Sequence, residues 1–262
     1  KQFIEAFIAE QNMLSVSLGL SKKGFRVFAS TFSAFLSRAH DQIRMASLSD
    51  ANFVVCGSHS GVSIGEDGSS QMGLEDISLF RSLNNSQVFY PSDALSAQKL
   101  TVAASKLSGI TYLRTSRPAT FPLYSSSEKF NVGDFKILKQ SKKDVAVFVG
   151  SGITVYEALK AHEAMGKKGI SVAVVDLYSI KPFNHAKFIR FVKKHGNKIV
   201  LAEDHRSEGG IGEMVAEGLV GKNISMKHLA VRKLSHSGTV DELLERHKIN
   251  SKAYLEGYKK LK

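Results

Sequence analysis

Short runs rich in β-branched residues alternate with stretches of helical spacing along most of this chain. In the first half, this pattern predicts strands at 26–30, 52–56, 87–90 and 110–114, and helices at 35–47, 74–83 and 93–107, the last capped by Ser92. In the second half, it predicts strands at 145–149, 171–177, 198–202 and 228–233, and helices at 154–165, 185–194, 212–220, 240–247 and 252–261. Such alternation is typical of parallel strands joined by crossover helices.

A break in this pattern divides the chain. Residues 118–133 hold two of the four prolines and a run of three serines, which is typical of a linker. We therefore expect an α/β protein with two consecutive three-layer domains and mainly parallel sheets. The expected bounds are 1–120 for the first domain, 121–133 for the linker and 134–262 for the second domain.

The composition limits the class of protein. The chain has 262 residues, of which 43% are apolar, enough for two cores. Its single cysteine excludes an internal disulfide and a CxxC zinc site. No apolar stretch approaches membrane-spanning length, so we expect a cytoplasmic location and no membrane contact. Because the chain lacks an initial Met and opens in a strand-like apolar run, we expect a fragment or a subunit without its upstream residues.

The net charge of +12 lies mostly in residues 131–262. Many of the lysines come in pairs at expected loops and helix ends, and no aromatic residues are interleaved with them. This arrangement favours a solvated basic surface, and we expect no nucleic-acid partner.

A carboxylate follows the apolar run that opens the chain. Glu10 comes directly after Phe3, Ile4, Phe7 and Ile8. A carboxylate in an apolar environment is costly unless something binds it, so Glu10 is a candidate acid/base group. The alternative is a helix-capping or ion-paired glutamate.

Two phenylalanines form a second candidate feature. Phe32 and Phe35 lie three residues apart, so on a helical turn they share a face. Ordinary core packing is the alternative. Beside a buried Glu10, however, such rings would give an aminopyrimidine a flat surface and a proton acceptor.

A glycine-rich loop and an arginine complete the candidate site. The loop from 57 to 68 carries His59 and Asp67, and its glycines would let the backbone approach a ligand closely. Arg117 follows the strand at 110–114, where ligands of parallel sheets bind, and could hold a phosphate. The alternatives are a flexible surface loop and an ion-paired arginine at a domain junction.

Together these segments resemble the carboxyl-terminal half of transketolases, especially the animal-type branch. The resemblance is carried by Ile8-Ala9-Glu10-Gln11, by Ser30-Thr31-Phe32 and by Gly57-Ser58-His59 with Gly65-Glu66-Asp67-Gly68, and it runs over the whole chain. It implies a pyrimidine-binding domain followed by a C-terminal domain. It also implies transfer of a two-carbon ketol unit between ketose and aldose phosphates in the pentose phosphate pathway.

The resemblance assigns roles to matching positions. Glu10 would contact the pyrimidine of thiamine diphosphate and assist its activation, and His59 would also take part in catalysis. The residues implied to bind cofactor are Glu10, Phe32, Phe35 and Gln71. The residues implied to bind substrate are His59, Asp67 and Arg117. Ser69 departs from the family, which usually has proline there, so the loop is expected to be less rigid.

The resemblance also indicates what the chain lacks. In the family, an amino-terminal domain holds the cofactor's diphosphate through a divalent cation, Mg or Ca, and no matching motif occurs here. We expect no metal ligand in this chain. The expected partner is an amino-terminal transketolase half, in a homodimer or a heteromer, and sugar phosphates are the expected substrates.

Other functions stay open at this point. Deoxyxylulose phosphate synthase and the β subunit of 2-oxo acid dehydrogenases share the Glu and the Ser-Thr-Phe segment, and a non-catalytic dimerisation partner is a further possibility. The cluster Glu203-Asp204-His205 suggests a metal or catalytic site by composition, but the resemblance places it in a domain for dimer packing, so it is assigned no chemistry. Arg38 is expected to be structural.

Overall fold

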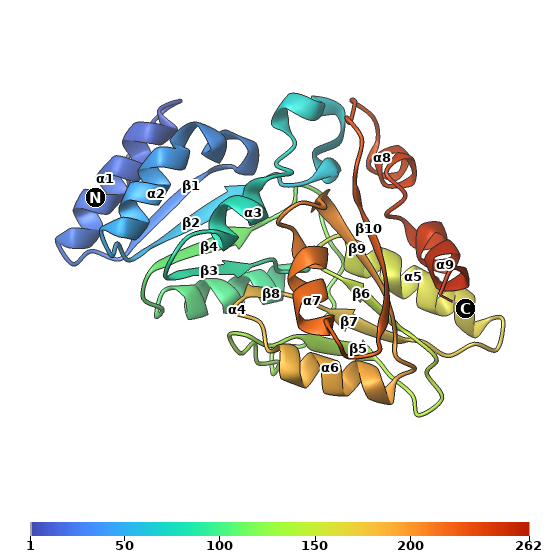
Figure 1. Cartoon of the computed structure of the whole chain (residues 1–262). Coiled ribbons are helices and arrows are strands. Elements are labelled where there is room, and N and C mark those ends of the chain that lie inside the picture. Colours follow the sequence, from blue (N-terminus) through green and yellow to red (C-terminus); the bar gives the residue numbers. More distant parts are fainter. Residues whose placement is uncertain (1, 262) are drawn as a thin grey trace.

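The chain forms two five-stranded, mainly parallel sheets, each with helices on both faces (Figure 1). The computed structural model describes residues 2–261. Two consecutive three-layer α/β units are therefore present, and the predicted fold class is confirmed.

The first sheet has the order β1-β2-β4-β3-β8. Its strands are β1 (Val27–Phe32), β2 (Phe53–Ser58), β3 (Ser86–Phe89), β4 (Ile110–Arg114) and β8 (Ser179–Lys181). One face packs against α1 (Glu10–Lys22), α2 (His40–Leu48) and α3 (Asp76–Arg81), and the other against α4 (Ala94–Ala104). Three short 3₁₀ segments, η1 (Ser33–Ala39), η2 (Val62–Asp67) and η3 (Ser69–Gln71), follow the carboxyl ends of β1 and β2.

The second sheet has the order β10-β9-β6-β7-β5. Its strands are β5 (Lys136–Lys139), β6 (Val147–Gly150), β7 (Ala173–Asp176), β9 (Lys198–Arg206) and β10 (Ser225–Val231). Its helices are α5 (Thr154–Gly166), α6 (His185–Lys194), α7 (Ile211–Leu219), α8 (Val240–Arg246) and α9 (Ser251–Lys259). Side chains alternate across β6, with Val147 and Val149 facing α6 and α7 and Phe148 facing α5 and α9.

The first difference from the prediction lies at the start of the chain. The apolar run before Glu10 forms no strand, and Phe3, Ile4, Phe7 and Ile8 are exposed. A helix, α1, begins at Glu10 instead. The pattern missed α1 because only Glu10, Leu14 and Ser17 of this helix are buried, which leaves little periodic signal.

Further differences concern element ends and short strands. The predicted helix at 35–47 is η1 followed by α2, and the cap of α4 is Asp93 rather than Ser92. Asp93 accepts the Ser96 amide at 2.7 Å, and the Ser96 hydroxyl accepts the Asp93 amide. The strand β5 was not predicted because it is a partly exposed edge strand that begins and ends with lysine, and β8 because it has only three residues.

The two halves are tied together. β8 comes from the second half of the chain but pairs antiparallel with β3 in the first sheet. Residues 121–133 lie outside helices and strands, and Asp93 accepts amide hydrogens from Leu123 and Tyr124 of this segment. The tyrosine hydroxyl donates to Asp176 at the end of β7, so one segment is held by carboxylates of both halves.

None of the helices within residues 2–261 has the length and apolar character needed to span a bilayer. Over the same residues, no group of three or more His, Cys, Asp or Glu side chains is arranged to hold a metal ion.

Candidate functional site

The candidate residues lie around the carboxyl edge of the first sheet. η1 with Phe35 follows β1, His59 follows β2 and Arg117 follows β4. These three strands are parallel neighbours, so their carboxyl ends meet at the same edge, where open α/β sheets bind ligands.

Glu10 is the first residue of α1 and is only 5% exposed. Its carboxylate accepts hydrogen bonds from Thr31 Oγ1 and from Arg38 Nη1, both at 3.3 Å. The amide groups of the first helical turn also favour a negative charge there. The carboxylate is therefore buried as predicted, although the apolar residues before it do not bury it. Its place at a helix start and its pairing with Arg38 also match the alternative interpretation.

Arg38 was expected to be structural, and sequence reasoning missed its contact with Glu10. Its guanidinium carbon lies 4.8 Å from the centre of the Phe35 ring, while its side chain stays 52% exposed. The available signal was spacing, because Arg38 lies three residues after Phe35 on η1. A planar N–H donor thus rests on an aromatic face beside a buried acid.

Phe32 belongs to a group of stacked rings. It stacks on Phe35 with ring centres 5.5 Å apart and on His59 with centres 4.0 Å apart. The two phenylalanines are nearly parallel, at 7°, and 5.5 Å leaves no room for another ring between them. A ligand ring at this site would therefore lie on Phe35, with Phe32 behind it.

His59 adopts a left-handed backbone conformation, with φ of 55°, at the start of the glycine-rich loop. Its Nδ1 lies 3.0 Å from Ser58 Oγ. Partial burial and the nearby Arg117 charge lower the pKa of His59, and Asp67 only partly offsets them. The imidazole is therefore neutral at pH 7 and can donate or accept a hydrogen bond.

Asp67 and Arg117 form an ion pair at the end of η2. Arg117 Nη1 donates to Asp67 Oδ1 at 3.0 Å and to the Ile64 carbonyl at 2.8 Å. Both side chains are partly exposed, so solvent or a polar ligand can reach them. Gln71 follows in η3, which packs against η1 and η2, so the loop returns toward the Phe35 segment.

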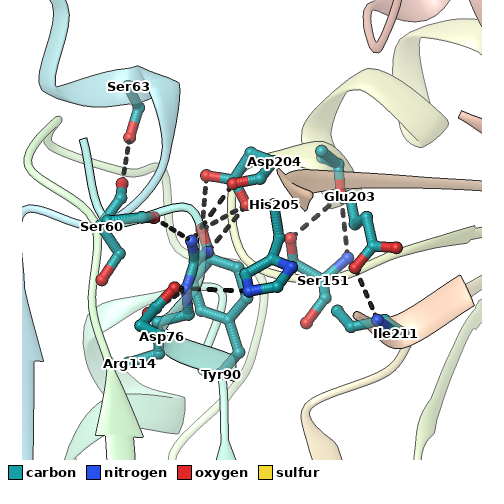
Figure 2. Close-up of polar contacts among 12 residues, drawn as sticks. Ser60, Ser63, Asp76, Tyr90, Arg114, Ser151, Glu203, Asp204, His205 and Ile211 are labelled. Atoms are coloured by element: carbon teal, nitrogen blue, oxygen red, sulfur yellow. Dashed lines mark hydrogen bonds and ion pairs between the residues drawn. The ribbon is translucent and has the colours of Figure 1, made fainter. Parts of the chain in front are cut away.

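A buried charge cluster, which we define as Asp76, Tyr90, Arg114 and Asp204, lies beneath this loop (Figure 2). Arg114 Nε donates to Asp76 at 2.7 Å and Nη1 to Asp204 at 2.9 Å. Tyr90 donates to both Asp204 oxygens at 3.1 Å. Burial raises the pKa of Asp204, whereas Arg114 overcomes burial at Asp76 and lowers the pKa of that carboxyl.

Comparison with known families matches both halves of the chain. Residues 1–122 match the family described as Transketolase, pyrimidine binding domain, and residues 133–253 match Transketolase, C-terminal domain. Transketolase-like protein 1 of Bos taurus is 48% identical over 254 residues, which are 96% of this chain and 43% of that protein. Transketolase of Homo sapiens is 44% identical over 262 residues, 99% of this chain and 42% of that protein. The chain thus spans about two fifths of the length of these relatives.

Solved structures share the fold. One, described as a split gene transketolase in an inactive β4 tetramer, has a TM-score of 0.85 and 31% identity, covering 96% of this chain and 81% of that one. The transketolase of Campylobacter jejuni has a TM-score of 0.79 over 99% of this chain and 39% of its own length. At 20% identity, this second likeness concerns the fold alone.

Proposed function

Because this chain belongs to the transketolase family, we propose that it supplies the pyrimidine-facing and sugar-facing half of a thiamine-diphosphate-dependent transketolase. The proposed reaction transfers a two-carbon ketol unit from a ketose phosphate to an aldose phosphate, in the pentose phosphate pathway. The observation that carries the proposal is the buried Glu10 carboxylate, whose partner is a planar N–H donor resting on Phe35.

The cofactor fits the residues at this position. The Arg38 guanidinium makes the two contacts that an aminopyrimidine would make here, a hydrogen bond to Glu10 and stacking on Phe35. Both groups are flat, carry N–H donors and stack on aromatic rings. Arg38 is half exposed and can turn toward solvent, which would leave Glu10 and Phe35 free for the cofactor ring.

Thiamine diphosphate, when bound, supplies a carbon nucleophile that attacks the sugar carbonyl. Glu10 would hold a proton at the pyrimidine nitrogen in the place that Arg38 now takes, because a buried carboxylate needs a donor there. Phe35 would orient the ring, with Phe32 supporting it, and Gln71 would contact the cofactor from η3.

The sugar-facing residues would act from the loop. His59, neutral at pH 7, can donate to an oxygen on which charge develops and can later accept that proton. Asp67 would accept from a sugar hydroxyl. Arg117 would bind the substrate phosphate, and its present pairing with Asp67 shows that its guanidinium reaches an anion at this point.

The rest of the site would come from another polypeptide segment. We propose that an amino-terminal transketolase half holds the diphosphate through Mg or Ca, in a homodimer or a heteromer. The cytoplasm is the location that fits this activity.

Reconstitution tests the proposed function. The chain is combined with an amino-terminal transketolase half, thiamine diphosphate and Mg, and is supplied with xylulose and ribose phosphates. Formation of sedoheptulose phosphate is the expected result. Turnover of pyruvate instead would favour the related enzymes named above, and a stable assembly that turns over neither substrate would favour a non-catalytic partner.

A further inference from the structure

Two adjacent acidic residues on β9, Glu203 and Asp204, point in different directions (Figure 2). Glu203 turns toward α7 and accepts the amides of Ile211 at 2.6 Å and Gly212 at 3.0 Å. Asp204 turns into the first half of the chain and meets Arg114. In the Glu203-Asp204-His205 cluster, which by composition suggested a metal or catalytic site, the first carboxylate therefore binds the start of α7 and the second binds the first half of the chain.

Arg114 connects Asp204 to Gly73, which pairs with the glycine-rich loop at Ser60 and Gly61. Its Nη2 donates to the Gly73 carbonyl at 3.0 Å and to the Asp204 carbonyl at 3.2 Å. Gly73 in turn accepts the Gly61 amide at 2.9 Å and forms a parallel bridge with Ser60. The loop that carries His59 and Asp67 is thus closed at its base by groups bound to Arg114.

Asp204 also packs directly on the loop backbone. A Cβ added to Gly61 would lie only 1.9 Å from Asp204 Oδ2, and Gly61 has a φ of 74°. This glycine, two residues after His59, is therefore required both by its conformation and by the carboxylate beside it. A shift of the Asp204 side chain changes the support of the turn that orients the imidazole.

The second half of the chain holds the remainder of the loop as well. Val62 and Ile64 belong to the same apolar cluster as Leu243 and Leu244 of α8. A Cβ on Gly68 would approach Ser237 Oγ to 2.7 Å. The loop between His59 and Asp67 is therefore built against the second unit along its length.

We propose that Asp204 is a positioning residue for the glycine-rich loop, acting through Gly61, Arg114 and Gly73 to fix His59 and Asp67. The C-terminal unit then shapes the sugar-facing side of the site in addition to packing. This inference rests on the proposed function for its kinetic consequences, but not for its structural ones.

The test compares Asp204→Asn with Glu203→Gln. Both changes remove one charge from buried carboxylates on the same strand, so they are matched in burial and differ in what the carboxylate holds. Hydrogen exchange of the backbone amides is measured by mass spectrometry in the chain. Asp204→Asn is expected to speed exchange at residues 61–73, whereas Glu203→Gln is expected to speed it in α7 and leave 61–73 unchanged.

Kinetics in the reconstituted assembly provide the second readout. Asp204→Asn is expected to raise KM for the sugar phosphates and to lower kcat/KM about ten-fold or more, because misplacing reacting groups is costly. Its affinity for thiamine diphosphate should change less than its kcat/KM, since Glu10 and Phe35 lie outside the cluster and Gln71 is the one proposed cofactor contact within residues 61–73. A merely structural role would instead weaken the binding of the cofactor and the binding of the sugar phosphates to the same extent.

The outcomes separate the two proposals. An inactive wild-type assembly counts against the proposed function, while the exchange comparison still tests the positioning role. Wild-type exchange at 61–73 and wild-type kinetics in Asp204→Asn would overturn that role. If Asp204→Asn fails to fold, Tyr90→Phe, which removes only the hydroxyl that donates to Asp204, is measured in its place. It is expected to speed exchange at 61–73 to a smaller extent, and unchanged exchange would overturn the proposal.

Discussion

Replacing Asp176 by Asn should remove a pH-dependent penalty on stability. Asp176 ends β7, is fully buried and accepts a hydrogen bond from Tyr124 of the segment between the two units. Burial raises the pKa of this carboxyl from 3.8 to about 7, although the Tyr124 hydroxyl acts in the opposite direction. The folded protein therefore keeps a proton here that the unfolded chain loses at much lower pH.

The sign and size of the effect follow from linkage. Between pH 3.8 and about 7 the folded state binds more protons than the unfolded state, so the stability contributed by this group falls as pH rises. A shift of about three pKa units corresponds to about 4 kcal/mol at 1.36 kcal/mol per unit, fully lost above pH 7. Asn carries no charge at any of these pH values and can still accept from Tyr124. The free energy of unfolding of Asp176→Asn minus that of the wild type should therefore increase by about 3 kcal/mol as the pH rises from 5 to 8.

Urea unfolding followed by circular dichroism, repeated from pH 5 to pH 8 on both proteins, measures this difference. Tyr124→Phe serves as a control, because loss of its hydrogen bond should raise the pKa of Asp176 further and move the window to higher pH. Parallel pH curves for wild type and Asp176→Asn would refute the reasoning, since they would mean that Asp176 is ionised in the folded protein at pH 5.

Two more predictions concern the candidate site. Arg117→Ala removes a charge that lowers the pKa of His59, so that pKa should rise, and an NMR titration of the imidazole in which it stays constant or falls would contradict the assignment. Arg38→Ala removes the group that rests on Phe35 and pairs with Glu10, so calorimetric titration should show thiamine binding about two- to five-fold more tightly, the size expected of a partly exposed ion pair. Weaker binding to this variant would mean that Arg38 holds the ligand and does not compete with it.

Much of the fold was predictable from the sequence because its strands are buried and rich in β-branched residues. The run at β6 is an example, since its alternating residues belong to the apolar clusters on the two faces of the second sheet. The short strand β8 was not predictable. It has three residues, and its partner β3 lies in the other half of the chain, so its pairing depends on tertiary contacts.

The candidate site was also predictable only in part. Parallel strand ends bring Phe35, His59 and Arg117 to one edge, and that follows from the alternation of strands and helices. The pairing of Arg38 with Glu10 does not follow, because α1 itself was missed. The approach of Asp204 to Gly61 could not be predicted either, because it brings a residue of β9 in the second sheet against the loop that follows β2 in the first.

The central claim is that Glu10 activates a cofactor bound on Phe35, and Glu10→Gln in the reconstituted assembly tests it most directly. This substitution keeps the shape and the hydrogen bond from Thr31 but removes the proton acceptor. We predict that kcat for ketol transfer falls about 100-fold or more, the effect typical of losing a general acid/base group, while circular dichroism and cofactor affinity change little. Turnover by Glu10→Gln equal to that of the wild type would contradict the account.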